Sequence, residues 1–183
     1  MIRVDANLVL VGVAVLVAAA LQDLIPATAA VPVKWPFLTA VALYYALMRP
    51  VLVALTVVIW AGLLTDVLGG LPPGCTCVFL GLMYVAARFL QRVALEVAVA
   101  TGMALTCGGA MLQQVWTRMW VKGTGVDVFS LEMLRLVGFA ALVGLVVGGA
   151  VFLVLGRLER FVCGAGALDG TGRPWMRRDE GGS

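Results

Sequence analysis

The chain has 183 residues, of which 62% are hydrophobic and 13% charged, and its formal net charge is +3. Soluble domains average about half apolar and about a quarter charged residues, so this composition is typical of an integral membrane protein. The apolar residues form blocks without two-residue alternation, which favours membrane-spanning helices over the strands of an outer-membrane barrel. Basic residues lie mainly at block edges and near the C-terminus, which argues against a nucleic-acid surface.

The residue types that common catalytic and metal sites need are scarce. The chain has no histidine, and its only serines are Ser130 and Ser183, which excludes a serine–histidine hydrolase and a di-histidine metalloenzyme. Four scattered cysteines form no C-x-x-C pair and are predicted to be small apolar packing residues: Cys75, Cys77, Cys107 and Cys163. The sequence therefore predicts no catalytic, metal or cofactor site, and a protein that is not an enzyme.

The first apolar block, residues 6–24, predicts a membrane-spanning helix. Ala14 and Ala18 lie one turn apart, so their face suits close approach of another helix, either a neighbour in the bundle or a partner protein. Ala27-x-Ala29 resembles the end of a signal peptide, but the charges before the block nearly cancel, which favours a retained span.

The second block, residues 36–48, is short for a span. At about 1.5 Å per residue it covers only about 20 Å of a hydrocarbon core of about 30 Å. It must recruit part of the preceding loop or be shielded by other helices. Tyr44 and Tyr45 are predicted to be interfacial anchors beside the Arg49-Pro50 turn.

The third block begins after Pro50 and contains a lone acid, Asp66, one turn after Gly62. An aspartate inside a membrane helix costs about 2.5 to 3.5 kcal/mol on insertion scales, so its presence needs a physical reason. A glycine pair and then two prolines predict the end of the helix and a tight turn. We treat these residues as one structural motif: Gly62, Asp66, Gly69, Gly70, Pro73 and Gly74.

Four roles for Asp66 are open. A proton or ion carrier would need a second buried titratable group, and a catalytic carboxylate would need a partner acid, a metal cluster or a phosphate motif. Asp66 as a pocket residue would contact a cationic group of a ligand. We favour the structural role, in which Asp66 accepts hydrogen bonds from backbone amides of the glycine/proline turn.

Three further spans complete the chain, over residues 75 to about 90, up to about Trp116, and 131–155. Residues 117–133 are predicted to be the longest loop, and Ser130 or Asp127 to cap the last helix. Gly144-x-x-x-Gly148 marks a second close-packing face. We predict an all-α, six-helix transmembrane domain over residues 1–155, followed by a basic, glycine-rich cytoplasmic tail over residues 156–183.

Positive charge indicates the orientation of these six spans. With both termini in the cytoplasm, nine basic residues lie inside and four outside, which agrees with the positive-inside rule. Five of the nine belong to the tail, so the count depends on it. The inside set is Arg3, Arg49, Arg88, Arg92, Arg157, Arg160, Arg173, Arg177 and Arg178, and the outside set is Lys34, Arg118, Lys122 and Arg135.

At these residues the sequence resembles the MreD family of bacterial rod-shape membrane proteins. The resemblance rests on Pro36, the Tyr44-Tyr45-Ala46-Leu47 segment, Gly62-Leu63-Leu64, Asp66, the glycine pair and Pro73-Gly74, and the doubled proline departs from the family pattern. The resemblance implies an inner-membrane scaffold of the cell-elongation complex without enzymatic activity. Its implied partners are MreC and, through MreC, the MreB filaments and the glycan polymerase and transpeptidase that build peptidoglycan.

The six-span layout is also similar to that of substrate-binding subunits of energy-coupling-factor transporters. This second resemblance implies a vitamin-like small-molecule ligand in place of protein partners. The two functions differ in what the protein binds, because a substrate-binding subunit retains a small molecule whereas a scaffold binds proteins and lipid.

Overall fold

A computed structural model describes residues 2–25, 34–93, 98–122 and 130–163. Over these residues the chain is all-helical. The helices are α1 (Ile2–Leu24), α2 (Phe37–Met48), α3 (Val51–Gly69), α4 (Cys75–Val93), α5 (Ala98–Lys122) and α6 (Leu131–Cys163).

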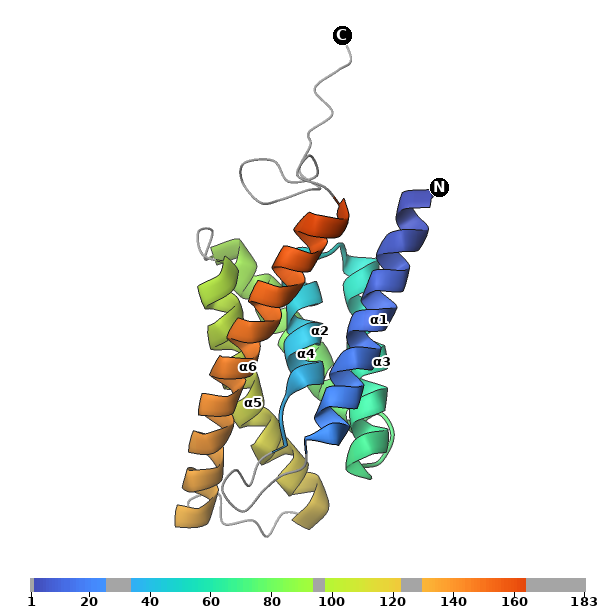
Figure 1. Ribbon diagram of the computed structural model, residues 1–183. Coiled ribbons are helices and arrows are strands. Elements are labelled where there is room, and N and C mark those ends of the chain that lie inside the picture. Colours follow the sequence, from blue (N-terminus) through green and yellow to red (C-terminus); the bar gives the residue numbers. More distant parts are fainter. Residues whose placement is uncertain (1, 26–33, 94–97, 123–129, 164–183) are drawn as a thin grey trace.

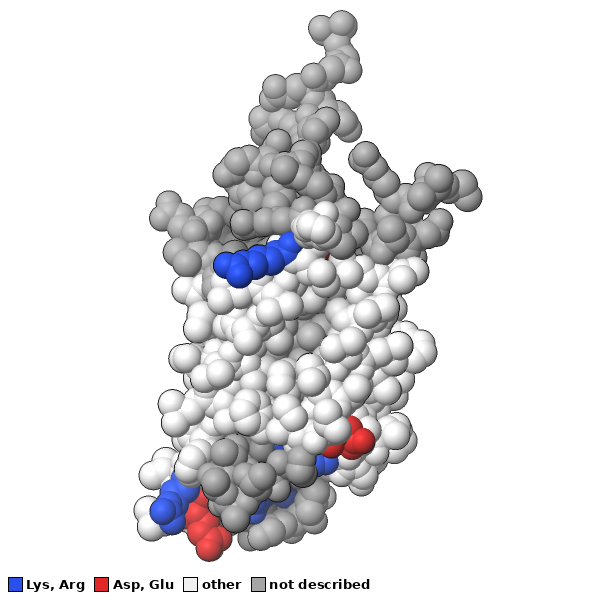
Figure 2. All heavy atoms as spheres, in the orientation of Figure 1, with Lys and Arg blue, Asp and Glu red and all other residues white. Residues whose placement is uncertain are grey.

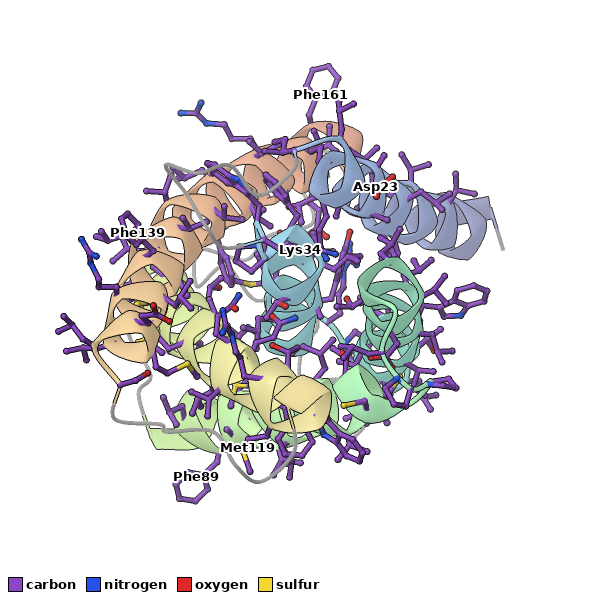
Figure 3. All side chains as sticks on the ribbon, turned by 90° about the horizontal axis from the view of Figure 1, so that it is seen from below. Asp23, Lys34, Phe89, Met119, Phe139 and Phe161 are labelled. Carbon is purple, nitrogen blue, oxygen red and sulfur yellow. The ribbon has the colours of Figure 1, made fainter. Side chains whose placement is uncertain are left out.

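The helices form an up-and-down bundle around a central helix. α2 contacts each of the other five helices, which surround it in the order α1, α3, α4, α5, α6 (Figure 3). α1 begins and α6 ends at one end of the bundle, which we call the termini end (Figure 1). The turn between α3 and α4 lies at the opposite end, the corner end.

The central position of α2 explains how so short an apolar helix is accommodated. Every residue from Leu38 to Leu47 is buried, so α2 is shielded by the other helices, one of the two arrangements that its length predicted. Tyr44 and Tyr45 are only 3% and 0% exposed. The prediction that they are interfacial anchors is therefore wrong, because both rings pack inside the bundle, where the Tyr44 ring meets Phe152 of α6 edge-on at 5.1 Å.

Two helices are longer than the sequence predicted. α5 continues past Trp116 to Lys122, which shortens the predicted loop over residues 117–133. α6 continues past Leu155 to Cys163, because Glu159 in its last turns bonds to residues of α2 and the adjoining turn. The predicted tail over residues 156–183 thus begins with helix, and its part after 163 lies outside the described residues, as do Ala27, Ala29 and Asp127.

Two of the helices have the length and composition to cross a membrane. They are Val51–Gly69, with mean hydropathy 2.3, and Leu131–Glu159, with mean hydropathy 2.6. Three shorter apolar segments accompany them in the part of the chain that the structure describes: Val9–Leu24, Phe37–Met48 and Cys75–Gln91.

Both small-residue faces are occupied inside the bundle. A side chain on Gly144 would lie 2.8 Å from Cβ of Ala110, and one on Gly148 would lie 2.7 Å from Cβ of Thr106, so both glycines allow close contact with α5. Ala18 is buried, and Ala14 packs against the same core. In the structure both faces therefore make packing contacts within the chain, one of the two uses predicted for them.

Candidate functional site

The α3–α4 corner, residues 62–77, is organised by the buried carboxylate of Asp66. Its Oδ2 accepts a hydrogen bond from the amide of Gly74 at 2.7 Å, and its Oδ1 accepts one from the amide of Thr76 at 2.9 Å. Those amides are free for capping because they lie at the start of α4. Asp66 therefore serves as an N-cap supplied by the preceding helix, with its negative charge at the positive end of the α4 dipole.

The backbone of Asp66 also ends α3. The amide of Leu71 donates to its carbonyl oxygen at 3.0 Å, and the amide of Gly70 donates to the carbonyl of Val67 at 3.4 Å. This pair of bonds is a Schellman motif, which requires a left-handed residue after the helix. Gly70 supplies it with φ of 63°. The predicted turn-fixing role of Asp66 agrees with these bonds. Its side chain caps α4, and its main-chain carbonyl ends α3.

Gly62 allows α3 and α4 to touch. A Cβ at this position would lie 2.7 Å from Cα and 2.8 Å from the amide nitrogen of Cys77, so the two backbones leave no room for a side chain. Glycine is needed at position 74 for a different reason, because φ there is 95°, a backbone angle that residues with a side chain rarely adopt. Gly69 and Pro73 contribute less, because a Cβ on Gly69 would make only ordinary contact with Leu71 and Pro73 is exposed.

A cavity of about 230 Å³ lies on the inner side of the corner. Residues from the end of α1, the segment just before α2, the end of α3 with the following turn, and the second half of α5 line it. Six of its eleven lining residues are polar, although apolar atoms form the larger part of its wall. The polar lining residues are Gln22, Lys34, Thr65, Gln113, Gln114 and Thr117.

Two glutamines in this lining are held by hydrogen bonds to α2. Oε1 of Gln22, which is buried, accepts from the amide of Leu38 at 3.2 Å and so caps the N-terminus of α2. Oε1 of Gln113 accepts from the hydroxyl of Thr39 at 2.6 Å. The oxygen of each side-chain amide is used in these bonds. The N–H groups of the two glutamines therefore remain as donors.

Lys34 is the charged member of the lining. Its ammonium donates to the carbonyl of Leu68 at 3.1 Å, near the C-terminus of α3. Seen from the corner end, Lys34 lies over the middle of the ring of helices, whereas Phe89 and Phe161 point outward from its rim (Figure 3).

The termini end holds a second polar cluster. Glu159 of α6 accepts from Arg49 at 2.8 Å and from the Tyr44 hydroxyl at 3.1 Å. Arg88 donates to the carbonyl of Arg49 at 2.6 Å, and the amide of Gln91 donates to the carbonyl of Leu47 at 2.6 Å. The last carbonyls of α2 are thus satisfied by side chains of α4, as helix C-termini require.

The sequence missed most of the cavity. Lys34 was assigned only to an outer loop, and the six polar residues come from four separate segments. Gln113 and Gln114, two adjacent amides within an apolar helix, were the available signal, because polar residues in such helices face the bundle interior. Within the described ranges, no three Cys, Asp or Glu side chains lie close enough together to hold a metal ion.

Comparisons of the chain with protein-family models, with curated proteins and with solved structures find no significant match.

Proposed function

We propose that the protein spans the bacterial inner membrane six times, with both termini in the cytoplasm. Large apolar side chains point outward on all sides of the bundle, such as Leu52 at 81% and Phe161 at 89% exposure. Figure 2 shows a face on which uncharged residues fill the middle while charged residues lie toward the two ends. A lipid environment accounts for such an apolar surface, which water would disfavour.

Within that membrane the protein is proposed to act as a non-enzymatic scaffold of the cell-elongation complex. The observation that supports this most is the α3–α4 corner. The resemblance to the MreD family rests on a motif whose residues come together at this corner. Four of them have separate structural roles there: Gly62, Asp66, Gly70 and Gly74. These residues have structural uses, which suits a protein that positions partners.

MreC is the proposed direct partner, and it would link the scaffold to MreB filaments and to the peptidoglycan polymerase and transpeptidase. The small-residue faces at Ala14/Ala18 and Gly144/Gly148 pack inside the bundle, so a partner's single span would bind the outward apolar surface instead.

Depletion in a rod-shaped host tests this proposal. We expect depleted cells to become round and to recover rod shape with the wild-type gene. Tagged protein should also retain MreC in a detergent extract, measured by mass spectrometry. A folded control of similar hydropathy from the same membrane should retain none. Normal rods after depletion, or equal MreC recovery with the control, would overturn the scaffold role.

A further inference from the structure

We propose that the cavity at the corner end is a binding site for a compact phosphate-bearing group. This proposal does not rest on the scaffold role. Its first basis is the chemistry of the lining, in which the ammonium of Lys34 and the amide N–H groups of three glutamines are donors. The hydroxyls of Thr65 and Thr117 already donate to backbone carbonyls of their own helices. A phosphate has more acceptor oxygens than a carboxylate and matches such a surplus of donors better.

Charge supports an anionic ligand. Lys34 is the charged side chain of the lining, and Pro36, which precedes the first residue of α2, also lines the cavity. The positive end of the α2 dipole therefore lies at the cavity wall. The negative end of α3 lies there too, at Gly69, and the ammonium of Lys34 offsets it through its bond to the carbonyl of Leu68. The carboxylate of Asp66 is not part of the lining, and backbone amides hold both of its oxygens.

Rigidity supports a preformed site. Gln22 is 8% exposed and Thr65 is 6% exposed, so these two polar side chains are held within the bundle at the cavity wall. Hydrogen bonds to Leu38 and Thr39 of α2 fix Gln22 and Gln113 from opposite helices. Buried polar side chains of this kind among apolar helices are costly to maintain without a use.

Size limits the ligand. At about 230 Å³ the cavity is smaller than the roughly 300 to 1,000 Å³ typical of drug-sized ligands. It suits a phosphate with a short attached group. Either a phospholipid headgroup, with its acyl chains outside the cavity, or a free phosphorylated small molecule has this chemistry.

Two binding measurements on the detergent-purified full chain distinguish these sources. Calorimetric titration with glycerol 3-phosphate tests a free ligand, with glycerol as the probe that lacks phosphate. Native mass spectrometry of retained dioleoylphosphatidylglycerol tests a lipid. We expect saturable binding of at least one phosphate probe and none of glycerol.

Lys34→Gln should weaken that binding about tenfold or more, because it removes a charge-assisted hydrogen bond. Arg157→Gln, at an exposed position of α6 near the termini end, is the matched control and should leave affinity unchanged. Gln114→Leu keeps the side-chain volume, removes donors from the lining and should also weaken binding. It provides the same readout if Lys34→Gln does not fold.

Binding of neither phosphate probe, or equal affinity of the wild type and the cavity variants, would overturn the site. Retention of the lipid alone would identify a headgroup site, and binding of glycerol 3-phosphate would identify a free ligand. Both results support the site. Neither result depends on cell shape, so failure of this proposal is distinguishable from failure of the scaffold role.

Discussion

The two ends of the bundle hold a carboxylate in different ways. At the corner end, Asp66 accepts hydrogen bonds from two backbone amides of α4 and is 1% exposed. At the termini end, Glu159 accepts from the side chains of Arg49 and Tyr44, and the side chains of its ion pair with Arg49 are 16% and 18% exposed.

This difference predicts different tolerances. Backbone amides cannot move away from Asp66 without moving α4, so the corner depends on the size, charge and number of acceptors at one position. Flexible side chains around Glu159 can rearrange, and water can replace part of what they lose. We therefore expect the corner to respond strongly and specifically to substitution, and the termini end to respond weakly and with a dependence on salt.

Substitution of Asp66 should have the largest effect. Asp66→Leu removes both acceptors and leaves two amides at the start of α4 without their partner, at a cost of about 3 to 6 kcal/mol. Asp66→Asn keeps one acceptor oxygen and should cost about half as much. The recovery of folded protein on size exclusion and the midpoint of thermal unfolding in detergent measure both. Equal loss for the two variants would show that the negative charge itself, and not the number of acceptors, holds the corner.

Close packing at Gly62 comes next. Gly62→Ala places a methyl group against the backbone of Cys77 and should cost about 1 to 3 kcal/mol, as overpacking does in other cores. Gly81→Ala is the matched control, because a Cβ at Gly81 of α4 would meet no neighbouring atom within 4 Å, and it should leave the unfolding midpoint unchanged or raise it. If both alanines had the same effect, contact between α3 and α4 would not be the reason for glycine at position 62.

The corner was the most predictable region because its signals are local. A buried acid, a glycine pair and two prolines follow one another within a few residues, and each restricts the backbone at its own position. This is why the role of Asp66 could be inferred from the sequence. The sequence did not indicate that the amide of Thr76 is one of its partners.

The rest of the bundle depends on contacts between distant residues. The interior position of Tyr44 and Tyr45 follows from α2 being surrounded, which the sequence of α2 does not encode by itself. The length of α6 follows from the bonds between Glu159 and residues near the end of α2. The polar side chains of the cavity come from four segments. They form one lining only when the fold brings these segments together.

The ion pair of the termini end should have a weaker effect than either substitution at the corner. Glu159→Gln should cost about 1 kcal/mol, and so should Arg49→Gln, because each removes a partly exposed charge-assisted bond. A double-mutant cycle in the unfolding midpoint should give a coupling on the order of 1 kcal/mol that shrinks at high salt. The Asp66→Leu effect should stay the same at high salt, because its hydrogen-bond partners are neutral. A salt-independent coupling at Glu159 would remove the contrast between the two ends.

The smallest effects separate the two tyrosines of α2. The Tyr44 hydroxyl donates to Glu159, so Tyr44→Phe should cost about 0.5 kcal/mol, the lower end of the range for one hydrogen bond. The Tyr45 hydroxyl is buried and has no hydrogen-bond partner among the described residues, so Tyr45→Phe should leave the unfolding midpoint unchanged or raise it slightly. Each variant is the other's control, because both remove one oxygen from adjacent buried rings. A cost for Tyr45→Phe equal to that of Tyr44→Phe would mean that the hydroxyl of Tyr45 has a partner at the termini end, and that the polar cluster around Glu159 reaches further into α2.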